Sequence, residues 1–257
     1  MLDLTGKRVL VTGGAQGIGK GLAKSCLKRG ATVVICNLDE RVAADTVAEL
    51  SELGPIRSLR SDVSVRSEVD ALIDDMEAHE GLPELVFCNA GYGGASPILG
   101  MPMTDVQSLF EVNFYSMIHL TQSYLPRVKT SGHIMYTGSE NSLVAPPYLK
   151  DMHMGMYGAT KHAMLVLAEW LRSELDGSGV SVSVLMPGPV LTERLAANID
   201  KFPETLKELF MTTDACAEVA MEGLEKGLFY IPTQSHIRRD VEQRYREIMA
   251  AFDQLRL

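Results

Sequence analysis

The sequence predicts an α/β fold in which a parallel sheet is doubly wound and carries helices on both faces. Short apolar runs alternate with amphipathic stretches along most of the 257 residues, as in chains that repeat a strand–helix–strand unit. The first run, residues 8–12, is followed at once by a cluster of glycines and a helical stretch. This order requires a right-handed crossover between parallel strands.

Strands are expected where apolar and β-branched residues run together, as in strands that are buried on both faces. Such runs cover residues 8–12, 31–36 and 85–88. Strands are also expected over residues 57–61, 133–137 and 180–185, the last of which alternates with period two. Helices are expected around residues 22–27 and over 41–53, 66–79, 104–125 and 155–175. The alternation as a whole predicts a seven-stranded sheet. Because neither a repeat nor a linker divides the chain, residues 1–257 are expected to form one domain.

Two segments near the C-terminus depart from this alternation. Residues 190–213 mix short apolar and charged pieces and are expected to form a mobile, helical substrate lid over a cleft. In residues 238–257, apolar side chains recur at spacings of four and three, which predicts an amphipathic helix. Its apolar face is expected to dock on its own domain or on a second copy of the chain. A helix lying on a membrane surface is the less favoured alternative.

Composition restricts the partners and the compartment. The chain has 33 acidic and 24 basic residues and a net charge of -9, which argues against nucleic acid and anionic membranes. No apolar run is long enough to span a membrane, and the N-terminus lacks the features of a secretory signal. The four cysteines are scattered, so neither a disulfide framework nor a metal site is expected. Reduced thiols and a cytoplasmic location are the simplest interpretation.

The most informative early feature is the glycine turn Thr12-Gly13-Gly14-Ala15-Gln16-Gly17-Ile18-Gly19. It lies between a predicted strand and a predicted helix, which is the context of a dinucleotide-binding turn. Glycines let the backbone approach a pyrophosphate, and the helix N-terminus offers unpaired N–H groups and a partial positive charge. A turn without a ligand is the alternative. In this context the pattern favours a Rossmann fold with a bound dinucleotide.

Further motifs follow the glycine turn in a fixed order. They are Asp62-Val63, Asn89-Ala90-Gly91, Asn113, Ser139, Tyr157-x3-Lys161 and Pro187-Gly188-Pro189-Val190-Leu191-Thr192. Together with the Thr-Gly-x3-Gly-x-Gly turn, they resemble the short-chain dehydrogenase/reductase family, in its branch of about 250 residues. The resemblance covers nearly the whole chain. It implies an NAD(P)-dependent oxidoreductase that transfers a hydride between a nicotinamide cofactor and a secondary alcohol or its ketone.

The resemblance assigns catalysis to Tyr157, Lys161, Ser139 and Asn113. Tyr157 and Lys161 are four positions apart on a predicted helix, so their side chains share one face. A nearby ammonium group and an oxidised nicotinamide both favour the phenolate, so Tyr157 is expected to act as the general base or acid. Ser139 is expected to hydrogen-bond the substrate oxygen. By resemblance, Lys161 also binds the nicotinamide ribose, and Asn113 holds a water that links Lys161 to solvent.

NAD is the favoured cofactor, and NADP stays possible. Asn37 stands where NAD users of the family usually carry an acidic residue, but Gln16 and Leu38 are uncharged where NADP users carry a cation. Arg41 is near enough to keep NADP open. The residues assigned to the cofactor are Gly13, Gln16, Gly17, Ile18, Gly19, Asn37, Asp62, Val63, Asn89, Ala90, Gly91, Tyr157, Lys161, Pro187, Gly188, Val190 and Thr192.

Two departures from the family pattern bear on the substrate. Ser139 and Tyr157 are 18 positions apart, about five more than is usual, and the surplus lies in residues 145–156, which are expected to rim the cleft. Gly138 stands where the family often has Ser. The expected cleft walls are Tyr92, Met152, His153, Met154, Leu191, Leu195 and Phe210, with Phe202 and Met211 beside them.

These walls favour a sizeable apolar or aromatic alcohol, because methionine adapts to irregular ligands. The methionines could equally fill the core, and His153 could be a solvated loop residue or an auxiliary acid–base group. Three other functions stay open: an NADPH-dependent 3-oxoacyl-thioester reductase, a nonenzymatic dinucleotide-binding sensor, and an assembly module built on the C-terminal helix. A homo-oligomer, dimer or tetramer, is expected.

Overall fold

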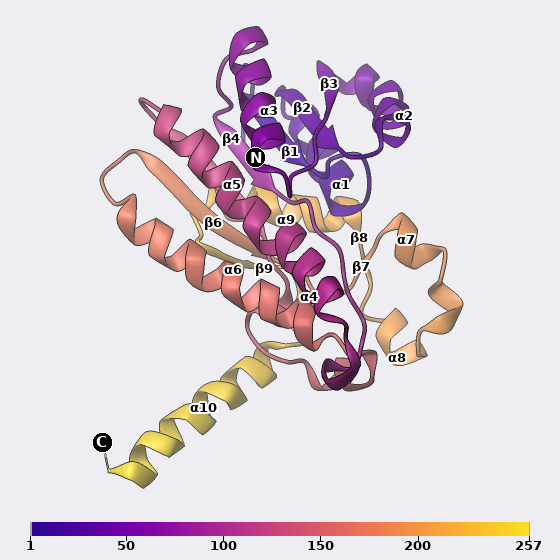
Figure 1. Ribbon diagram of the computed structural model, residues 1–257, viewed down its shortest axis with the longest axis vertical. Coiled ribbons are helices and arrows are strands. Elements are labelled where there is room, and N and C mark those ends of the chain that lie inside the picture. Colours follow the sequence, from indigo (N-terminus) through magenta and orange to yellow (C-terminus); the bar gives the residue numbers. More distant parts are fainter. Residues whose placement is uncertain (1, 257) are drawn as a thin grey trace.

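The computed structural model describes residues 2–256 and confirms the doubly wound α/β fold (Figure 1). Its main sheet has seven strands, all parallel, in the order β3-β2-β1-β4-β5-β6-β9. The strands are β1 (Arg8–Thr12), β2 (Thr32–Asn37), β3 (Ile56–Arg60), β4 (Leu85–Cys88), β5 (Gly132–Thr137), β6 (Val180–Met186) and β9 (Tyr230–Pro232). The strand order reverses beside β1, as in a dinucleotide-binding sheet.

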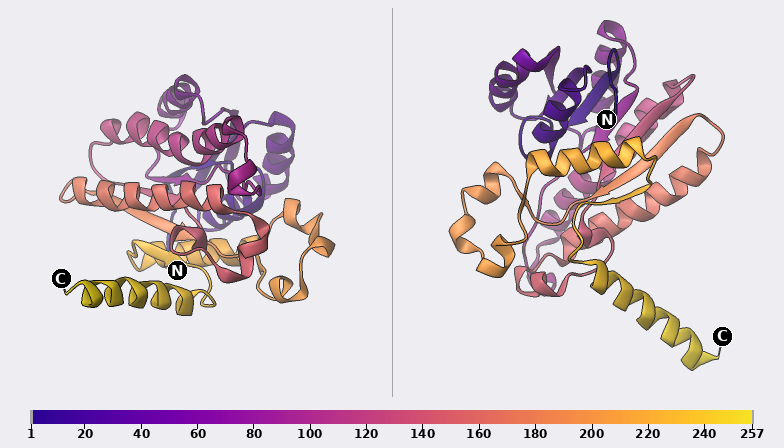
Figure 2. Two further views of the ribbon diagram at one scale, coloured as in Figure 1. Left: turned by 60° about the horizontal axis from the view of Figure 1, so that its bottom comes forward. Right: turned by 180° about the vertical axis from the view of Figure 1, so that it is seen from behind.

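Helices cover both faces of this sheet (Figure 2). One core cluster joins the sheet to α1 (Gly17–Leu27), α2 (Glu40–Leu50) and α9 (Thr213–Glu225). The other joins it to α3 (Arg66–His79), α5 (Ser116–Tyr124) and α6 (Gly155–Glu174). Alternate residues of β1 enter opposite clusters and are fully buried. The central strands β1, β2 and β4 are therefore almost entirely apolar, which is why the sequence reveals them as continuous runs.

Six of the seven strands begin and end within about one residue of their predicted ranges. The seventh, β9, has no recognisable run. It contains three residues, and only Ile231 of them is buried. It ends at Pro232, which is tolerated because β9 lies at the edge of the sheet.

The helix expected over residues 104–125 is interrupted. It consists of α4 (Met103–Phe110), a π-helical turn (Glu111–Tyr115) and α5, followed by a short 3₁₀ turn. Asn113 lies inside the π turn and is fully buried. Such turns often mark functional positions, because the extra residue redirects one side chain.

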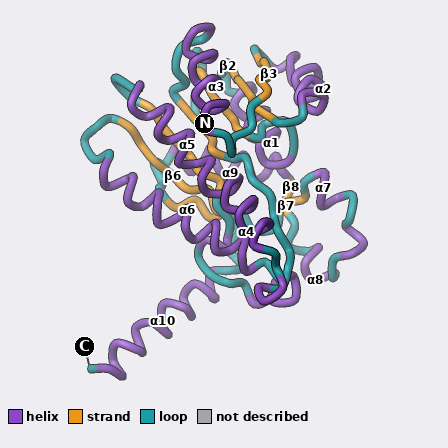
Figure 3. The backbone as a smooth tube through the Cα atoms, viewed as in Figure 1, coloured by secondary structure: helices purple, strands orange, loops and turns teal. Residues whose placement is uncertain are grey.

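The lid, residues 190–213, is more regular than expected. It contains β7 (Val190–Leu191), α7 (Glu193–Ala196), α8 (Glu204–Lys207) and β8 (Met211–Thr212). β7 and β8 pair in parallel and close the segment at its base, as the tube in Figure 3 shows. The small sheet fixes both ends of the lid next to the carboxyl end of β6.

The amphipathic C-terminal helix is present as α10 (Arg238–Leu255), but it does not dock on its own domain. It projects away from the body in Figures 1 and 2, and no residue of its fully described length is buried. The first half of α10 lies against the body, where Arg244 Nη1 hydrogen-bonds the carbonyl of Leu143 and contacts His162 Nε2 at 2.8 Å. Residue 257, the end of the predicted helix, lies outside the described residues. Within residues 2–256, no helix is both long and apolar enough to cross a membrane.

Candidate active site

A cleft of about 730 Å³ opens at the carboxyl ends of the central strands, the usual ligand position in such sheets. It collects residues from the glycine turn, the ends of β2 to β6, the insertion and the lid. Of the residues assigned to the cofactor, those that line it are Gly13, Gln16, Gly17, Ile18, Asn37, Asp62, Val63, Asn89, Ala90, Gly91, Tyr157, Lys161, Pro187, Gly188, Val190 and Thr192.

Gly19 is the exception, because it packs the turn instead of lining the cleft. A Cβ added there would lie 2.2 Å from the carbonyl oxygen of Gly13 and 2.6 Å from Asn89 Nδ2. Gly13 and Gly17 have positive φ angles, of 61° and 57°, which favour glycine. A Cβ on Gly13 would also meet the backbone of Ala90 at 3.0 Å. The turn therefore needs glycine both for its conformation and for its close contacts.

The N-terminus of α1 already binds an anionic group. The backbone N–H of Gly17 donates to the Glu193 carboxylate at 2.8 Å, and the N-cap residue Gln16 provides no side-chain hydrogen bond. This carboxylate, from the first residue of α7, takes the position that suits a phosphate at a helix N-terminus. The site therefore fits the pyrophosphate of a dinucleotide. Glu193 directly follows the Thr192 motif, but no pattern in the sequence marks it as a site residue.

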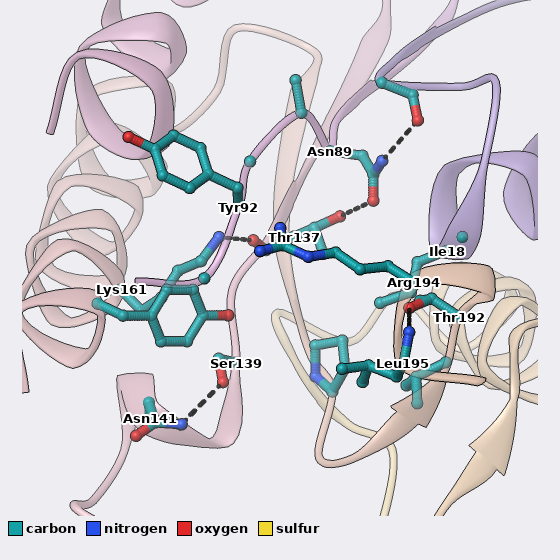
Figure 4. Close-up of a pocket in the computed structure, with 18 of the residues that line it drawn as sticks. Ile18, Asn89, Tyr92, Thr137, Ser139, Asn141, Lys161, Thr192, Arg194 and Leu195 are labelled. Atoms are coloured by element: carbon teal, nitrogen blue, oxygen red, sulfur yellow. Dashed lines mark hydrogen bonds between the residues drawn. The ribbon is translucent and has the colours of Figure 1, made fainter. Parts of the chain in front are cut away.

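At the β2 end of the cleft, uncharged side chains stand where a cation would meet a 2′-phosphate. Asn37 and Leu38 line the cleft there, and Asn37 Nδ2 donates to the carbonyl of Asp39 at 3.2 Å. Arg41 is exposed and is not among the lining residues. Of the lining residues that the structure describes, Lys161 and Arg194 are the cations. Arg194 belongs to the lid and reaches into the cleft (Figure 4).

The structure brings Ser139, Tyr157 and Lys161 together at the floor of the cleft. Ser139 follows β5, and the other two project from the first turns of α6. The Ser139 hydroxyl lies close enough to the Tyr157 phenol to favour its ionised form. Lys161 Nζ lies 5.7 Å from the centre of the Tyr157 ring and donates to the carbonyl of Thr137 at 2.7 Å (Figure 4). A buried hydroxyl, a half-buried phenol and a buried ammonium group thus meet in one corner of the cleft.

Burial governs the acidity of this corner. It raises the pKa of Tyr157, the neighbouring Ser139 hydroxyl opposes this, and the charge of Glu140 raises the pKa further. Burial also lowers the pKa of Lys161 to about 8. Removing the phenolate from water is the largest of these contributions, and Lys161 donates to a backbone carbonyl.

Local hydrogen bonds hold Ser139 in place. It caps a 3₁₀ turn, Glu140–Ser142, and its Oγ accepts from the backbone and side-chain nitrogens of Asn141 at 3.1 and 3.3 Å. The departure at Gly138 also has an explanation. A Cβ there would lie 2.9 Å from Ser142 Oγ and 3.1 Å from the carbonyl of Leu185, so a serine would not fit without a shift.

Asn113 lies behind the cleft instead of in its lining. Its carboxamide makes a pair of 2.9 Å hydrogen bonds to the backbone N–H and carbonyl of Tyr92, and its Nδ2 also lies 3.3 Å from Thr160 Oγ1. The π turn places it there. It fixes the segment after β4, which carries the Asn89-Ala90-Gly91 motif.

The outer part of the cleft is mostly apolar. Tyr92, Met152, Met154, Leu195 and Phe210 line it as expected, and so do Leu149, Phe202 and Leu206. His153, Leu191 and Met211 do not. His153 ends a 3₁₀ turn in the left-handed conformation, and its carbonyl accepts from Ser96 N at 3.1 Å. Leu191 alternates with the buried Val190 and faces outward.

Further polar residues line the cleft without having been predicted as site residues, among them Glu140, Tyr148 and Arg194. Glu140 is 3% exposed, although its position directly after Ser139 was a usable signal. Tyr148 belongs to the insertion between Ser139 and Tyr157. Its orientation depends on contacts with residues far away in the sequence.

Comparisons with known proteins agree with this geometry. Residues 7–202 match the family model described as short chain dehydrogenase. A 1-deoxy-11-beta-hydroxypentalenate dehydrogenase of Streptomyces avermitilis is 28% identical over 96% of this chain and 92% of its own length. A 7alpha-hydroxysteroid dehydrogenase of Escherichia coli K12 is 31% identical over 82% of this chain and 81% of its own length.

A solved structure agrees as well. A short-chain dehydrogenase/reductase of Burkholderia phymatum, in complex with NAD, is 28% identical and superposes with a TM-score of 0.86 over 98% of this chain and 97% of that one. The family match, the fold and the cleft lead to one conclusion: the chain is an oxidoreductase with a nucleotide-binding Rossmann fold, and it belongs to the short-chain dehydrogenase/reductase family.

Proposed function

We propose that this oxidoreductase transfers a hydride between NAD, in preference to NADP, and a sizeable apolar or aromatic secondary alcohol or its ketone. The observation that carries the proposal is the meeting of Ser139, Tyr157 and Lys161 at the floor of a cleft with apolar outer walls. At the floor, Tyr157 can move a proton and Ser139 can orient the substrate oxygen. The walls exclude water and favour an apolar substrate.

In this proposal Ser139 hydrogen-bonds the substrate oxygen and holds it beside Tyr157, which takes the alcohol proton or returns it to the ketone. Lys161 keeps positive charge near the phenol and favours its ionised form during the transfer. A bound nicotinamide supplies the hydride acceptor or donor. Lys161 is also the candidate to hold the nicotinamide ribose, and Asn113 keeps its assigned supporting role, with its carboxamide tied to Tyr92.

The preference for NAD is supported by the uncharged surroundings of Asn37 and Leu38 and by the exposed position of Arg41. The cofactor residues assigned above would hold the dinucleotide, with its pyrophosphate at the N-terminus of α1. Comparing kcat/KM for the two cofactors tests the preference. A Leu38→Arg variant is the matched probe, since it adds the missing cation and should improve NADP use. A strong NADP preference in the wild-type enzyme would contradict the proposal.

The substrate class is supported by the apolar lining and by the names of two relatives, which act on a hydroxysteroid and a hydroxypentalenate. The test is a panel of 1-phenylethanol, the 7α-hydroxysteroid cholate, the polyol sorbitol and a 3-hydroxybutyryl thioester, each with NAD and NADP. Reduction of the nicotinamide is followed by absorbance. We expect the highest kcat/KM for an aryl alcohol or the steroid; sorbitol as the best substrate would refute the apolar class, and the thioester would favour the acyl reductase.

Tyr157→Phe tests the catalytic assignment. The change removes only the phenolic oxygen, so turnover should fall by about a thousandfold or more, while the Kd for NAD should stay within about threefold. Tyr115→Phe is the control, because Tyr115 is exposed and does not line the cleft. A Tyr157→Phe enzyme with near wild-type turnover would rule out this role.

The proposal also includes a cytoplasmic location and a dimer or tetramer. Light scattering at micromolar concentration checks the oligomeric state.

A further inference from the structure

One buried acidic side chain beside the catalytic serine has no part in the proposed reaction. Glu140 directly follows Ser139 and is 3% exposed, and both of its carboxylate oxygens are engaged by the protein. The Tyr148 hydroxyl donates to Oε1, and the His236 Nε2–H donates to Oε2 at 2.8 Å. A buried carboxylate is costly unless it is hydrogen-bonded, so these partners are required for the fold around it.

The partners of Glu140 come from separate parts of the chain. Tyr148 lies in the 3₁₀ turn Pro147–Met152 of the insertion, and His236 lies in the segment that connects β9 to α10. Their rings also contact each other edge to face, with centroids 5.5 Å apart. On the main chain, Glu140 N donates to the carbonyl of Pro187 at 2.8 Å. Glu140 therefore joins the insertion, the C-terminal segment and the Pro187 loop.

The C-terminal segment continues these contacts around the cleft. Gln234 Nε2 hydrogen-bonds the carbonyl of Leu209 in the lid and lies 3.4 Å from the carbonyl of Pro189. Gly188 N donates to Thr233 Oγ1 at 3.4 Å. A Cβ on Gly188 would collide with Gln234 and lie 3.0 Å from Glu140 Oε2. The segment is thus packed closely against the loop that carries the cofactor motif.

We propose that Glu140, Tyr148 and His236 form a positioning cluster that fastens the insertion and the C-terminal segment against Ser139 and so sets the substrate side of the cleft. The cluster acts through the cleft walls, because Glu140 and Tyr148 line the cleft and Leu149 and Met152 of the same turn complete its rim. None of the three moves a proton in the reaction. The link to substrate rests on the proposed function, whereas the fastening does not.

The charge of Glu140 gives the cluster a second effect. Burial raises the pKa of Glu140 and the nearby charge of Asp240 raises it further, whereas the hydrogen bonds from Tyr148 and His236 favour the carboxylate. The Glu140 charge in turn raises the pKa of Tyr157. Replacing Glu140 by the neutral, similarly shaped glutamine should therefore move the Tyr157 limb of the pH profile to lower pH.

Hydrogen–deuterium exchange of the cofactor-free protein tests the fastening without any substrate. Tyr148→Phe removes one hydroxyl, and exchange in residues 145–154 should rise by about tenfold, the loss of one hydrogen bond to a charged group. Tyr230→Phe is the matched control, because Tyr230 also donates to a carboxylate, that of Glu169 at 2.7 Å, outside the cleft lining. It should leave residues 145–154 unchanged. Equal exchange in wild type and Tyr148→Phe would overturn the proposal.

Kinetics on 1-phenylethanol or cholate, whichever is turned over, test the effect on substrate. Tyr148→Phe and Glu140→Ala should raise KM by about tenfold and leave the Kd for NAD within about threefold. Because Glu140→Ala also removes the charge that acts on Tyr157, its kcat is compared at the plateau of each pH profile. In Glu140→Gln, KM should return most of the way to the wild-type value, and the Tyr157 limb of the pH profile should move to lower pH. Faster exchange with an unchanged KM would overturn the substrate role. If the wild type turns over neither alcohol, the proposed function fails, and the exchange experiment alone still decides whether the cluster fastens the insertion.

Discussion

A single carboxylate occupies the place where the phosphates of the cofactor are proposed to bind. Glu193 accepts a hydrogen bond from Gly17 N at the start of α1, and the next residue, Arg194, lines the same cleft. A cofactor must displace the Glu193 carboxylate before its own anion can reach the N–H groups of the turn. We therefore expect cofactor binding to be an exchange of anions, in which the Glu193 carboxylate competes with the phosphates.

Removing the charge of Glu193 should tighten cofactor binding. In Glu193→Gln the side chain keeps its size but loses its attraction to the helix N-terminus, so the Kd for NAD should fall by about threefold to tenfold. Titration calorimetry measures the change. Glu204→Gln is the control, because Glu204 is a lid carboxylate paired with Lys207 at 2.7 Å outside the cleft lining. A Kd that is unchanged or weaker in Glu193→Gln would show that the carboxylate does not compete.

Lys161 should make stability depend on pH. Burial lowers its pKa to about 8 from the ordinary 10.5, so between these values the unfolded chain holds a proton that the folded chain has released. The free energy of unfolding should then rise with pH across this window, by about 3 kcal/mol for this group. Urea titrations at several pH values across it measure the rise. Lys161→Met should lack this contribution, and parallel pH profiles for the two proteins would contradict the prediction.

At the scale of elements, the π turn between α4 and α5 places Asn113 where it holds the backbone of Tyr92 beside the cleft. The apolar pattern of residues 104–125 predicts helix but carries no mark of the extra residue in the turn. That residue places Asn113 so that its carboxamide pairs with both backbone groups of Tyr92. The turn therefore depends on a contact between positions 21 residues apart, which a local pattern does not contain.

Asn113→Ala should destabilise the fold by about 2–4 kcal/mol, because it leaves the N–H and carbonyl of Tyr92 without their partners. Urea denaturation measures the loss. Asn198→Ala is the comparison, since the Asn198 amide also donates to a main-chain carbonyl, that of Arg194, but on the exposed lid. It should cost less than about 0.5 kcal/mol. Similar losses for the two variants would mean that Asn113 has no special structural role.

For the whole molecule, local signals predict the parts and distant contacts decide how they join. The apolar runs and the glycine spacing predict six strands and most of the cofactor cleft, because each depends on neighbouring residues. The edge strand β9, the orientation of Glu140 and the direction of α10 do not follow from any run. Glu140 and His236 are 96 residues apart, and β9 has one buried side chain. Each of these features is fixed by tertiary packing.

The projecting α10 should be dispensable for the stability of the body. Its apolar stripe is exposed, with Tyr245 64% and Phe252 48% accessible, so deleting residues 245–257 should change Tm by less than about 2 °C. Deleting residues 233–257 also removes Gln234 and His236, and this should lower Tm by much more. Thermal unfolding of the two truncations checks the contrast. A large fall in Tm on deletion of residues 245–257 alone would mean that α10 supports the body, for example through a second copy of the chain.

The packing of α9 on α1 has a consequence for how the protein is made. These helices share buried residues such as Leu22 and Cys216, and an ion pair of 2.6 Å joins Lys24 to Asp214 across 190 residues of sequence. On the ribosome, α1 and its glycine turn emerge long before the helix that covers them. We therefore expect the packing around α1 to be completed only after residues 213–225 have emerged from the ribosome.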